Sequence, residues 1–127
     1  MSNYLLHAYR EENDKWQQTL NVQRMELPAM REVLSELIRN KPGEKTIENA
    51  RSLNIKLEVQ TGVIDQISEK IQLQQDKLGT LQNETPEQTK SLTAFYDQEE
   101  LRDELLRFQK NYLDLKQLFH SYLLSVL

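Results

Sequence analysis

The sequence predicts an all-α protein, specifically an elongated antiparallel three-helix bundle of coiled-coil type. Three observations predict this fold. Apolar residues recur in alternating steps of three and four through three long runs, short breaks separate the runs, and the runs account for nearly all of the 127 residues. A mean step of 3.5 residues places each run on one face of a helix, so three amphipathic helices bury their stripes against one another. We expect a single domain over residues 1–127.

The first helix is expected over residues 3–40. Pro28 lies inside it, where it removes one backbone hydrogen bond and costs about 3 kcal/mol if the helix stays straight. We therefore expect a kink near Glu26; the alternative is a separate short helix that begins at Pro28. The apolar stripe consists of Leu6, Tyr9, Asn13, Trp16, Leu20, Gln23, Leu27, Met30, Leu34 and Leu37.

The second and third helices are expected over residues 44–81 and 86–126. Pro42 and Gly43 favour a turn before the second helix, while Thr85 and Pro86 suit the N-cap and first position of the third. The second stripe consists of Ala50, Leu53, Leu57, Gln60, Ile64, Ile67, Ile71, Gln74, Leu78 and Leu81. The third consists of Ala94, Gln98, Leu101, Leu105, Phe108, Tyr112, Leu115, Phe119, Tyr122 and Val126.

The stripes also predict how the helices align. If the first two helices pack antiparallel, the numbers of facing residues add up to about 87, and those of the second and third to about 175. Asn13 then faces Gln74 inside an otherwise apolar seam. A buried polar pair costs stability but fixes register, as Asn does in coiled coils. Chance coincidence of two polar positions is the alternative.

Charge and composition exclude several classes of function. The net charge is −4, and residues 84–104 carry seven acidic residues against two basic ones. Binding to a phosphate backbone or an anionic membrane surface needs clustered Lys and Arg, so we expect no nucleic-acid or membrane partner. No segment approaches the roughly 20 apolar residues that span a bilayer, and the chain begins without a secretory pattern. With no cysteine, a reducing compartment is suitable, and we expect a cytoplasmic protein.

The sequence offers no arrangement typical of catalysis or metal binding. The inward-facing Glu-x-x-His pairs of di-iron bundles are absent, because Tyr4 precedes His7 and Gln117 precedes His120 at that spacing. No nucleophile is paired with a base. We expect no enzyme activity, no cofactor and no metal. Four carboxylates cluster outside the third stripe, which favours a solvated face: Glu99, Glu100, Asp103 and Glu104.

Surplus apolar residues outside the stripes carry the functional prediction. Outer positions of a three-helix bundle should be polar, but several are apolar, and five of these are expected to gather near one end of the rod: Ile55, Val59, Leu106, Leu113 and Leu124. They predict a non-enzymatic protein–protein interaction module, such as an adaptor, assembly subunit or chaperone-like binder, acting by helix–helix docking. Gly62, opposite the second stripe, would suit a closely approaching partner helix.

Two alternatives remain at this stage. In the first, two chains align their long helices into a homo-oligomeric coiled-coil structural protein, so that self-association covers the surplus apolar residues. In the second, Glu99, Asp103 and neighbouring carboxylates form a site for a metal ion or small molecule. Scattered exposed leucines are also normal on soluble proteins, and a wide core stripe would absorb some of them.

Overall fold

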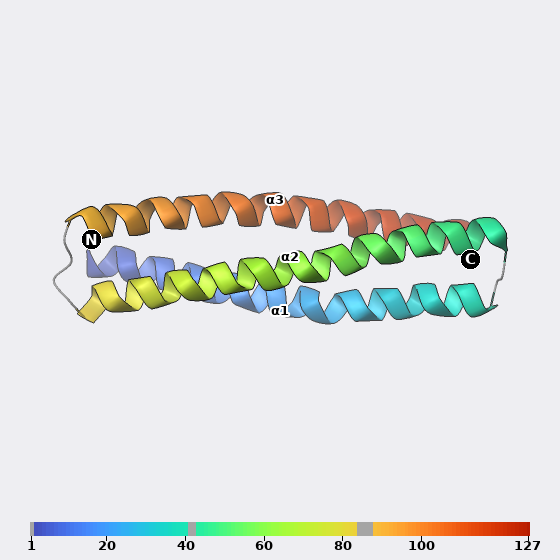
Figure 1. Ribbon diagram of the computed structural model, residues 1–127, viewed down its shortest axis with the longest axis horizontal. Helices are drawn as coiled ribbons and strands as arrows, with labels where there is room; N and C mark the ends of the chain where they lie inside the picture. The colour runs from blue at the N-terminus through green and yellow to red at the C-terminus, as the bar shows by residue number, and fades with distance from the viewer. Residues whose placement is uncertain (1, 41–42, 84–87) are drawn as a thin grey trace.

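The structure, a computed structural model, describes residues 2–40, 43–83 and 88–127, without the side chains of residues 82, 83, 88 and 89. It consists of three helices: α1 (Asn3–Asn40), α2 (Glu44–Asn83) and α3 (Gln88–Val126), with no strand in the described ranges (Figure 1). The predicted all-α three-helix bundle is confirmed. The turn predicted at Pro42 and the helix start predicted at Thr85 and Pro86 lie outside the described residues.

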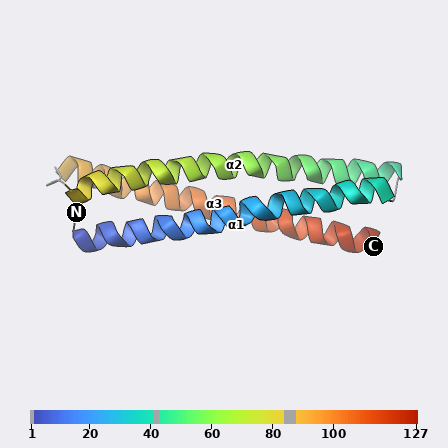
Figure 2. The ribbon, with the colours of Figure 1, turned by 90° about the horizontal axis from the view of Figure 1, so that it is seen from below.

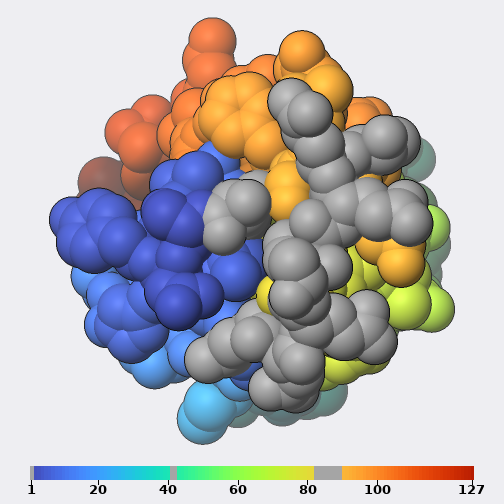
Figure 3. All heavy atoms as spheres, turned by 90° about the vertical axis from the view of Figure 1, so that its left-hand side faces the viewer, coloured from blue at the N-terminus to red at the C-terminus, as the bar shows by residue number. Residues whose placement is uncertain are grey.

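The three helices form a rod in which α2 runs antiparallel to both neighbours. The N-terminus and the C-terminus lie at opposite ends, and α2 crosses α1 obliquely along the length of the rod (Figures 1 and 2). At the end where α1 begins, its first residues lie beside the first described turns of α3 (Figure 3). None of the described helices combines the length and the apolar character needed to cross a bilayer.

Local interactions explain how α1 begins and continues. The hydroxyl of Ser2 accepts a hydrogen bond from the backbone N–H of Leu5 at 3.1 Å, which is the N-cap geometry that satisfies a free N–H in the first turn. The helix then passes through Pro28 without interruption. A separate helix beginning at Pro28 is therefore wrong, while the kink near Glu26 stays a prediction. Pro28 is exposed, so its ring displaces no core side chain.

The three predicted stripes form the core of the bundle. Almost every stripe residue is buried, including the polar Asn13, Gln23, Gln74 and Gln98. The stripe positions that are only half-buried are Trp16, Gln60, Tyr122 and Val126. Because the same 3.5-residue period continues through all three helices, each helix keeps one face toward the common axis of the rod.

Side-chain pairs fix the alignment of the helices close to the predicted register. Between α1 and α2, Gln17 bonds with Ser68 and Arg24 with Asp65, so paired residue numbers add up to 85 and 89. Between α2 and α3, the Nζ of Lys70 lies 2.9 Å from a carboxylate oxygen of Glu104, and these numbers add up to 174. The predicted values of about 87 and about 175 are confirmed.

A layer of three buried amides divides the core. Asn13 and Gln98 exchange hydrogen bonds of 2.9 and 3.3 Å, and the Nε2 of Gln74 donates to the Oε1 of Gln98 at 3.1 Å. The predicted facing pair of Asn13 and Gln74 is thus part of a layer with one residue from each helix, joined through Gln98. We call this the amide layer.

The amide layer separates two apolar clusters of unequal size. On one side lies the main core, which extends from Leu20 and Ile71 to the far end of the rod and holds seventeen buried apolar residues of the described ranges. On the other side lies the end core, with five described residues: Leu6, Tyr9, Leu78, Leu81 and Ala94. Among the described residues, the end near the start of α1 therefore has far less apolar contact to stabilise it.

Candidate functional site

Two ion-pair clusters join α1 to α3 on one side of the rod. In the first, Arg102 lies 2.6 Å from an oxygen of Glu12 and also pairs with Glu99. In the second, the Nζ of Lys116 lies 2.6 Å from Glu26, whose other oxygen accepts a hydrogen bond from the Tyr112 hydroxyl at 2.8 Å. The clusters are fourteen residues apart on both helices, which is two heptads, so they repeat on the same face.

The contacts within these clusters shift pKa values in the directions that favour charge on the ion pairs. The hydrogen bond from Lys116 lowers the pKa of Glu26 below its ordinary 4.5, against the opposing effect of burial. Burial, followed by the hydrogen bond to Glu26, raises the pKa of Tyr112. The hydrogen bond to Glu12 is the main cause that raises the pKa of Arg102. These directions favour a structural role for both clusters.

Between the two clusters lies a groove with a volume of about 310 Å³, which we call the α1–α3 groove. Its walls come from both helices: Glu12, Trp16, Thr19, Arg102, Leu105, Leu106 and Gln109. Trp16 belongs to the first apolar stripe but is only half-buried, so part of its indole faces the groove. Gln23 and Gln109 exchange two hydrogen bonds that join the same two helices further along.

Two of the five predicted partner-binding residues lie along this groove. Leu106 is 64% exposed and lines it directly. Leu113 is 55% exposed and lies one heptad further along α3, so it projects from the same side of that helix. Leu106 also follows Arg102, which faces α1, by one helical turn. These two leucines and Trp16 form an apolar strip beside the groove.

The other three predicted residues lie elsewhere, although all three are exposed. Val59 precedes Val63 by one turn, and Val63 lines a hollow against α3, so Val59 projects beside the opposite side of α3 from Leu106. Ile55 lies a further turn away on the outer face of α2, and Leu124 lies near the end of α3. The expected single patch of five residues is therefore not formed. The sequence gives the position of these residues along the axis of the rod, but the side of the rod from which each one projects depends on how the helices pack.

Basic side chains border the α1–α3 groove. Lys110 lies four residues after Leu106 and three before Leu113, which makes it their neighbour on the helix surface. Lys15 precedes Thr19, which lines the groove, by one turn. Both lysines are exposed, and neither forms an ion pair with another described residue. The border of the groove thus combines an apolar strip with two lysines that form no ion pair with another described residue.

The carboxylates of α3 do not gather into a metal site. Glu99 is paired with Arg102 and Glu104 with Lys70, while Asp103 projects to solvent. Within the described ranges, no group of three His, Asp or Glu side chains has the proximity that a metal ion needs. His7 pairs with Glu11 on the exposed surface of α1. The carboxylate hypothesis therefore gains no geometric support for a metal ion.

Sequence reasoning missed the ion-pair clusters and the position of Trp16. Glu12 and Glu26 precede stripe residues, and Arg102 and Lys116 follow them, so a heptad analysis of the stripe flanks would have found both pairs. Trp16 was assigned to the core because it continues the stripe. Trp16 is only half-buried because its burial depends on the distance between α1 and α3, and the apolar pattern of a single helix does not determine that distance.

The fold and groove define an all-α, antiparallel three-helix bundle with a candidate binding groove between its two parallel helices. Comparison with protein families, with curated proteins and with solved structures found no match to the chain.

Proposed function

We propose that this protein is a non-enzymatic binding module that holds an amphipathic helix of a partner protein along the α1–α3 groove. The observation that carries the proposal is the exposure of Leu106 and Leu113 beside the half-buried Trp16. Exposed leucines one heptad apart on a helix are the knobs that a partner helix needs for coiled-coil packing. An adaptor, assembly subunit or chaperone-like binder would act in this way.

The groove supports a partner of defined length and charge. The two ion-pair clusters are fourteen residues apart, so a helical partner between them spans about 21 Å, or about four turns. The exposed ammonium groups of Lys15 and Lys110 favour acidic residues beside the partner's apolar stripe. A peptide with this pattern is therefore expected to bind more tightly than the same peptide with basic flanks.

The single tryptophan supplies a direct readout of binding. Trp16 is the sole tryptophan of the chain and lines the groove, so a docked helix removes its exposed part from water. The probe is a Trp-free helical peptide with Leu at heptad positions a and d and Glu beside them. We expect its addition to shift the tryptophan emission to shorter wavelength in a saturable manner, whereas a Lys-flanked version of the peptide gives a weaker effect.

Paired charge substitutions test which surface binds. The double variant Leu106→Glu and Leu113→Glu is expected to lose peptide binding and to keep its helical content. The matched control, Ile55→Glu and Val59→Glu, places the same charges on exposed apolar positions of another face and is expected to keep binding. Equal binding by both variants would contradict the proposal, and so would loss of helicity in the first, because that would assign its leucines to the core.

Self-association is the alternative occupant of the same surface. Light scattering over a dilution series distinguishes it: the proposal predicts a constant molar mass near 15.1 kDa. A stable multiple of this mass that reverts to the monomer in the Leu106→Glu and Leu113→Glu variant would contradict docking of a foreign helix. It would favour the homo-oligomeric coiled-coil reading instead.

A further inference from the structure

The α1 side of the α1–α3 groove carries an exposed apolar residue of its own. Val22 is 59% exposed. It follows Thr19, which lines the groove, by three residues, and it precedes Glu26, which contacts α3, by four. Residues three and four apart lie on the same side of a helix, so Val22 projects from the groove side of α1.

Hydrogen bonds across the groove place Val22 between the two exposed leucines of α3 along the axis of the rod. Gln23 exchanges two hydrogen bonds with Gln109, so these two residues lie at one level. Leu106 precedes Gln109 by one turn and Leu113 follows it by one turn. Val22, the neighbour of Gln23, therefore lies on the opposite wall at a level between the leucines.

Each wall of the groove also carries an exposed lysine. Lys15 precedes Val22 by one heptad, so the two residues project from the same face of α1. Lys110 lies between Leu106 and Leu113 on the surface of α3. Neither ammonium group pairs with a carboxylate of another described residue. The exposed apolar residues are therefore flanked by positive charge on both sides of the groove.

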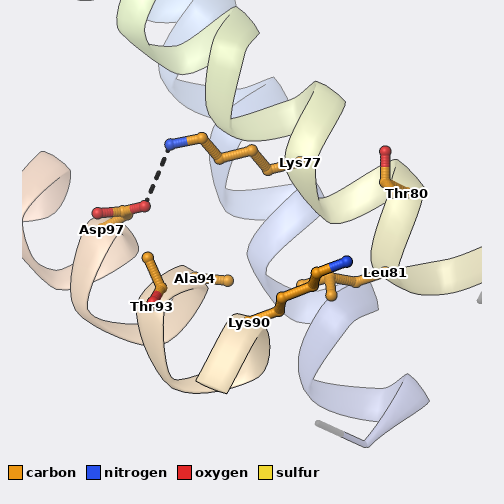
Figure 4. Close-up of a pocket in the computed structure, with 7 residues that line it drawn as sticks. All are labelled: Lys77, Thr80, Leu81, Lys90, Thr93, Ala94 and Asp97. Atoms are coloured by element: carbon orange, nitrogen blue, oxygen red, sulfur yellow. Dashed lines mark hydrogen bonds and ion pairs between the residues drawn. The ribbon is translucent and has the colours of Figure 1, made fainter. Parts of the chain in front are cut away.

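The hollows between α2 and α3 show a different arrangement of charge. The first, of about 320 Å³, lies at the end core, where Ala94 supplies only a methyl group beside Leu81 (Figure 4). Lys77 and Asp97 face each other across it at 3.3 Å, and both also line a second hollow of about 200 Å³. The lysine that borders both hollows is thus already paired within the bundle, unlike the two lysines of the α1–α3 groove.

We propose that both walls hold the partner helix at once, so that it lies over the midline of the α1–α3 groove as the fourth helix of a bundle. Its successive seam residues, about 5 Å apart along the axis, contact Leu106, Val22 and Leu113 in turn. Carboxylates flank its apolar stripe on both sides, one row facing Lys15 and the other Lys110. This binding mode rests on the proposed function, because it requires that a helix docks in the groove.

A neutral substitution on α1 tests whether the second wall contacts the partner. The probe is the Glu-flanked helical peptide, and its binding is followed by the emission of Trp16. Val22→Gln is expected to weaken binding about ten-fold, because it removes an apolar contact without changing the charge. The matched control is Val59→Gln, the same substitution at a valine of α2 that is 56% exposed, and it should change affinity less than about two-fold. Circular dichroism should show the same helical content in both variants.

The outcomes distinguish failure of this binding mode from failure of the proposed function. Full binding by Val22→Gln, together with lost binding in the Leu106→Glu and Leu113→Glu variant, would overturn the two-walled mode and leave a helix docked on α3 alone. Equal weakening by Val22→Gln and Val59→Gln would also overturn it. Absence of saturable binding to the unaltered protein would overturn both the binding mode and the proposed function.

Double-mutant cycles at low ionic strength test the two charged flanks. Two further versions of the peptide keep Glu on one side of the apolar stripe and carry Gln on the other. Lys15→Gln should weaken binding about three-fold only for the version with Glu on one flank, and Lys110→Gln only for the version with Glu on the opposite flank. Dependence of both lysines on the same flank, or no effect of Lys15→Gln on either version, would overturn the two-walled mode.

Discussion

The two ends of this rod follow the same heptad pattern but are stabilised in different ways. Of the side chains that the structure describes, the main core joins seventeen buried apolar ones from all three helices, whereas the end core joins five and includes the short side chain of Ala94. The amide layer of Asn13, Gln74 and Gln98 lies between them. An unbroken apolar stripe therefore determines which residues face inward but does not make the interior uniformly stable.

The largest expected difference comes from removing leucine side chains on the two sides of the amide layer. Leu57 is completely buried in the main core, so Leu57→Ala should lower the free energy of unfolding by about 3 kcal/mol. Leu81 already borders a hollow, so Leu81→Ala should cost about 2 kcal/mol. Urea denaturation measures both losses of free energy, provided that the dependence of the unfolding free energy on urea concentration keeps the same slope. An equal or larger loss in Leu81→Ala would contradict the comparison.

Removing the centre of the amide layer is the next largest effect. Gln98→Ala leaves the amides of Asn13 and Gln74 without their shared partner, and we expect a loss of about 2 kcal/mol in the free energy of unfolding. Gln66→Ala is the control, since Gln66 is exposed on α2 and should change stability by less than about 0.5 kcal/mol. Thermal melts followed by circular dichroism measure the change in stability of both variants. A neutral Gln98→Ala would show that the layer is not a stabilising network.

The ion-pair cluster at Glu26 should make a smaller, pH-dependent contribution. Because the folded-state pKa of Glu26 lies below 4.5, its contribution is complete above pH 4.5 and is lost as the pH falls through the folded value. Glu26 is about one third exposed, so Glu26→Gln should cost only about 1 kcal/mol at pH 7 and less at about pH 3. Glu36→Gln, at an exposed position of α1, is the control and should change the free energy of unfolding at pH 7 by less than about 0.5 kcal/mol. A cost for Glu26→Gln that is equal at both pH values would contradict this assignment.

The smallest expected effect is a gain of stability at Gly62. Apart from its own chain neighbours and the adjacent backbone of α2, a Cβ atom added there meets no atom within 4 Å, so Gly62→Ala should raise the free energy of unfolding by about 0.5–1 kcal/mol. The same substitution tests the expectation that a partner helix approaches closely at this position. Weaker binding of the helical probe by Gly62→Ala would contradict docking in the α1–α3 groove, because Gly62 lies on α2.

The stripes predict the helices and the alignment of successive helices well. The period of the apolar residues and the length of chain between two stripes can both be taken directly from the sequence. The stripes identify Asn13, Gln74 and Gln98 as seam residues, and the predicted sums bring all three to one level. The joining of Asn13 to Gln74 through Gln98 was not predicted, because the alignment was worked out only for successive helices. The alignment of the two parallel helices, α1 and α3, was not predicted.

The same omission explains why the candidate site was predicted only in part. Exposure of Leu106 and Leu113 follows from their distance from the third stripe, and the structure bears this out. Their position beside Trp16 depends on which side of α3 faces α1, and this is determined by three-dimensional contacts such as Glu12 with Arg102. The hollows between α2 and α3 were not predictable, because they depend on how the short side chain of Ala94 fits against Leu81.

Native-state amide hydrogen exchange tests most directly the central claim that the amide layer divides the bundle into a strong and a weak part. We expect residues 3–12 of α1 and 76–81 of α2 to exchange through openings of lower free energy than residues 20–37 and 50–71. Gln98→Ala should widen this difference. Equal protection of both regions, lost only in global unfolding, would contradict the account.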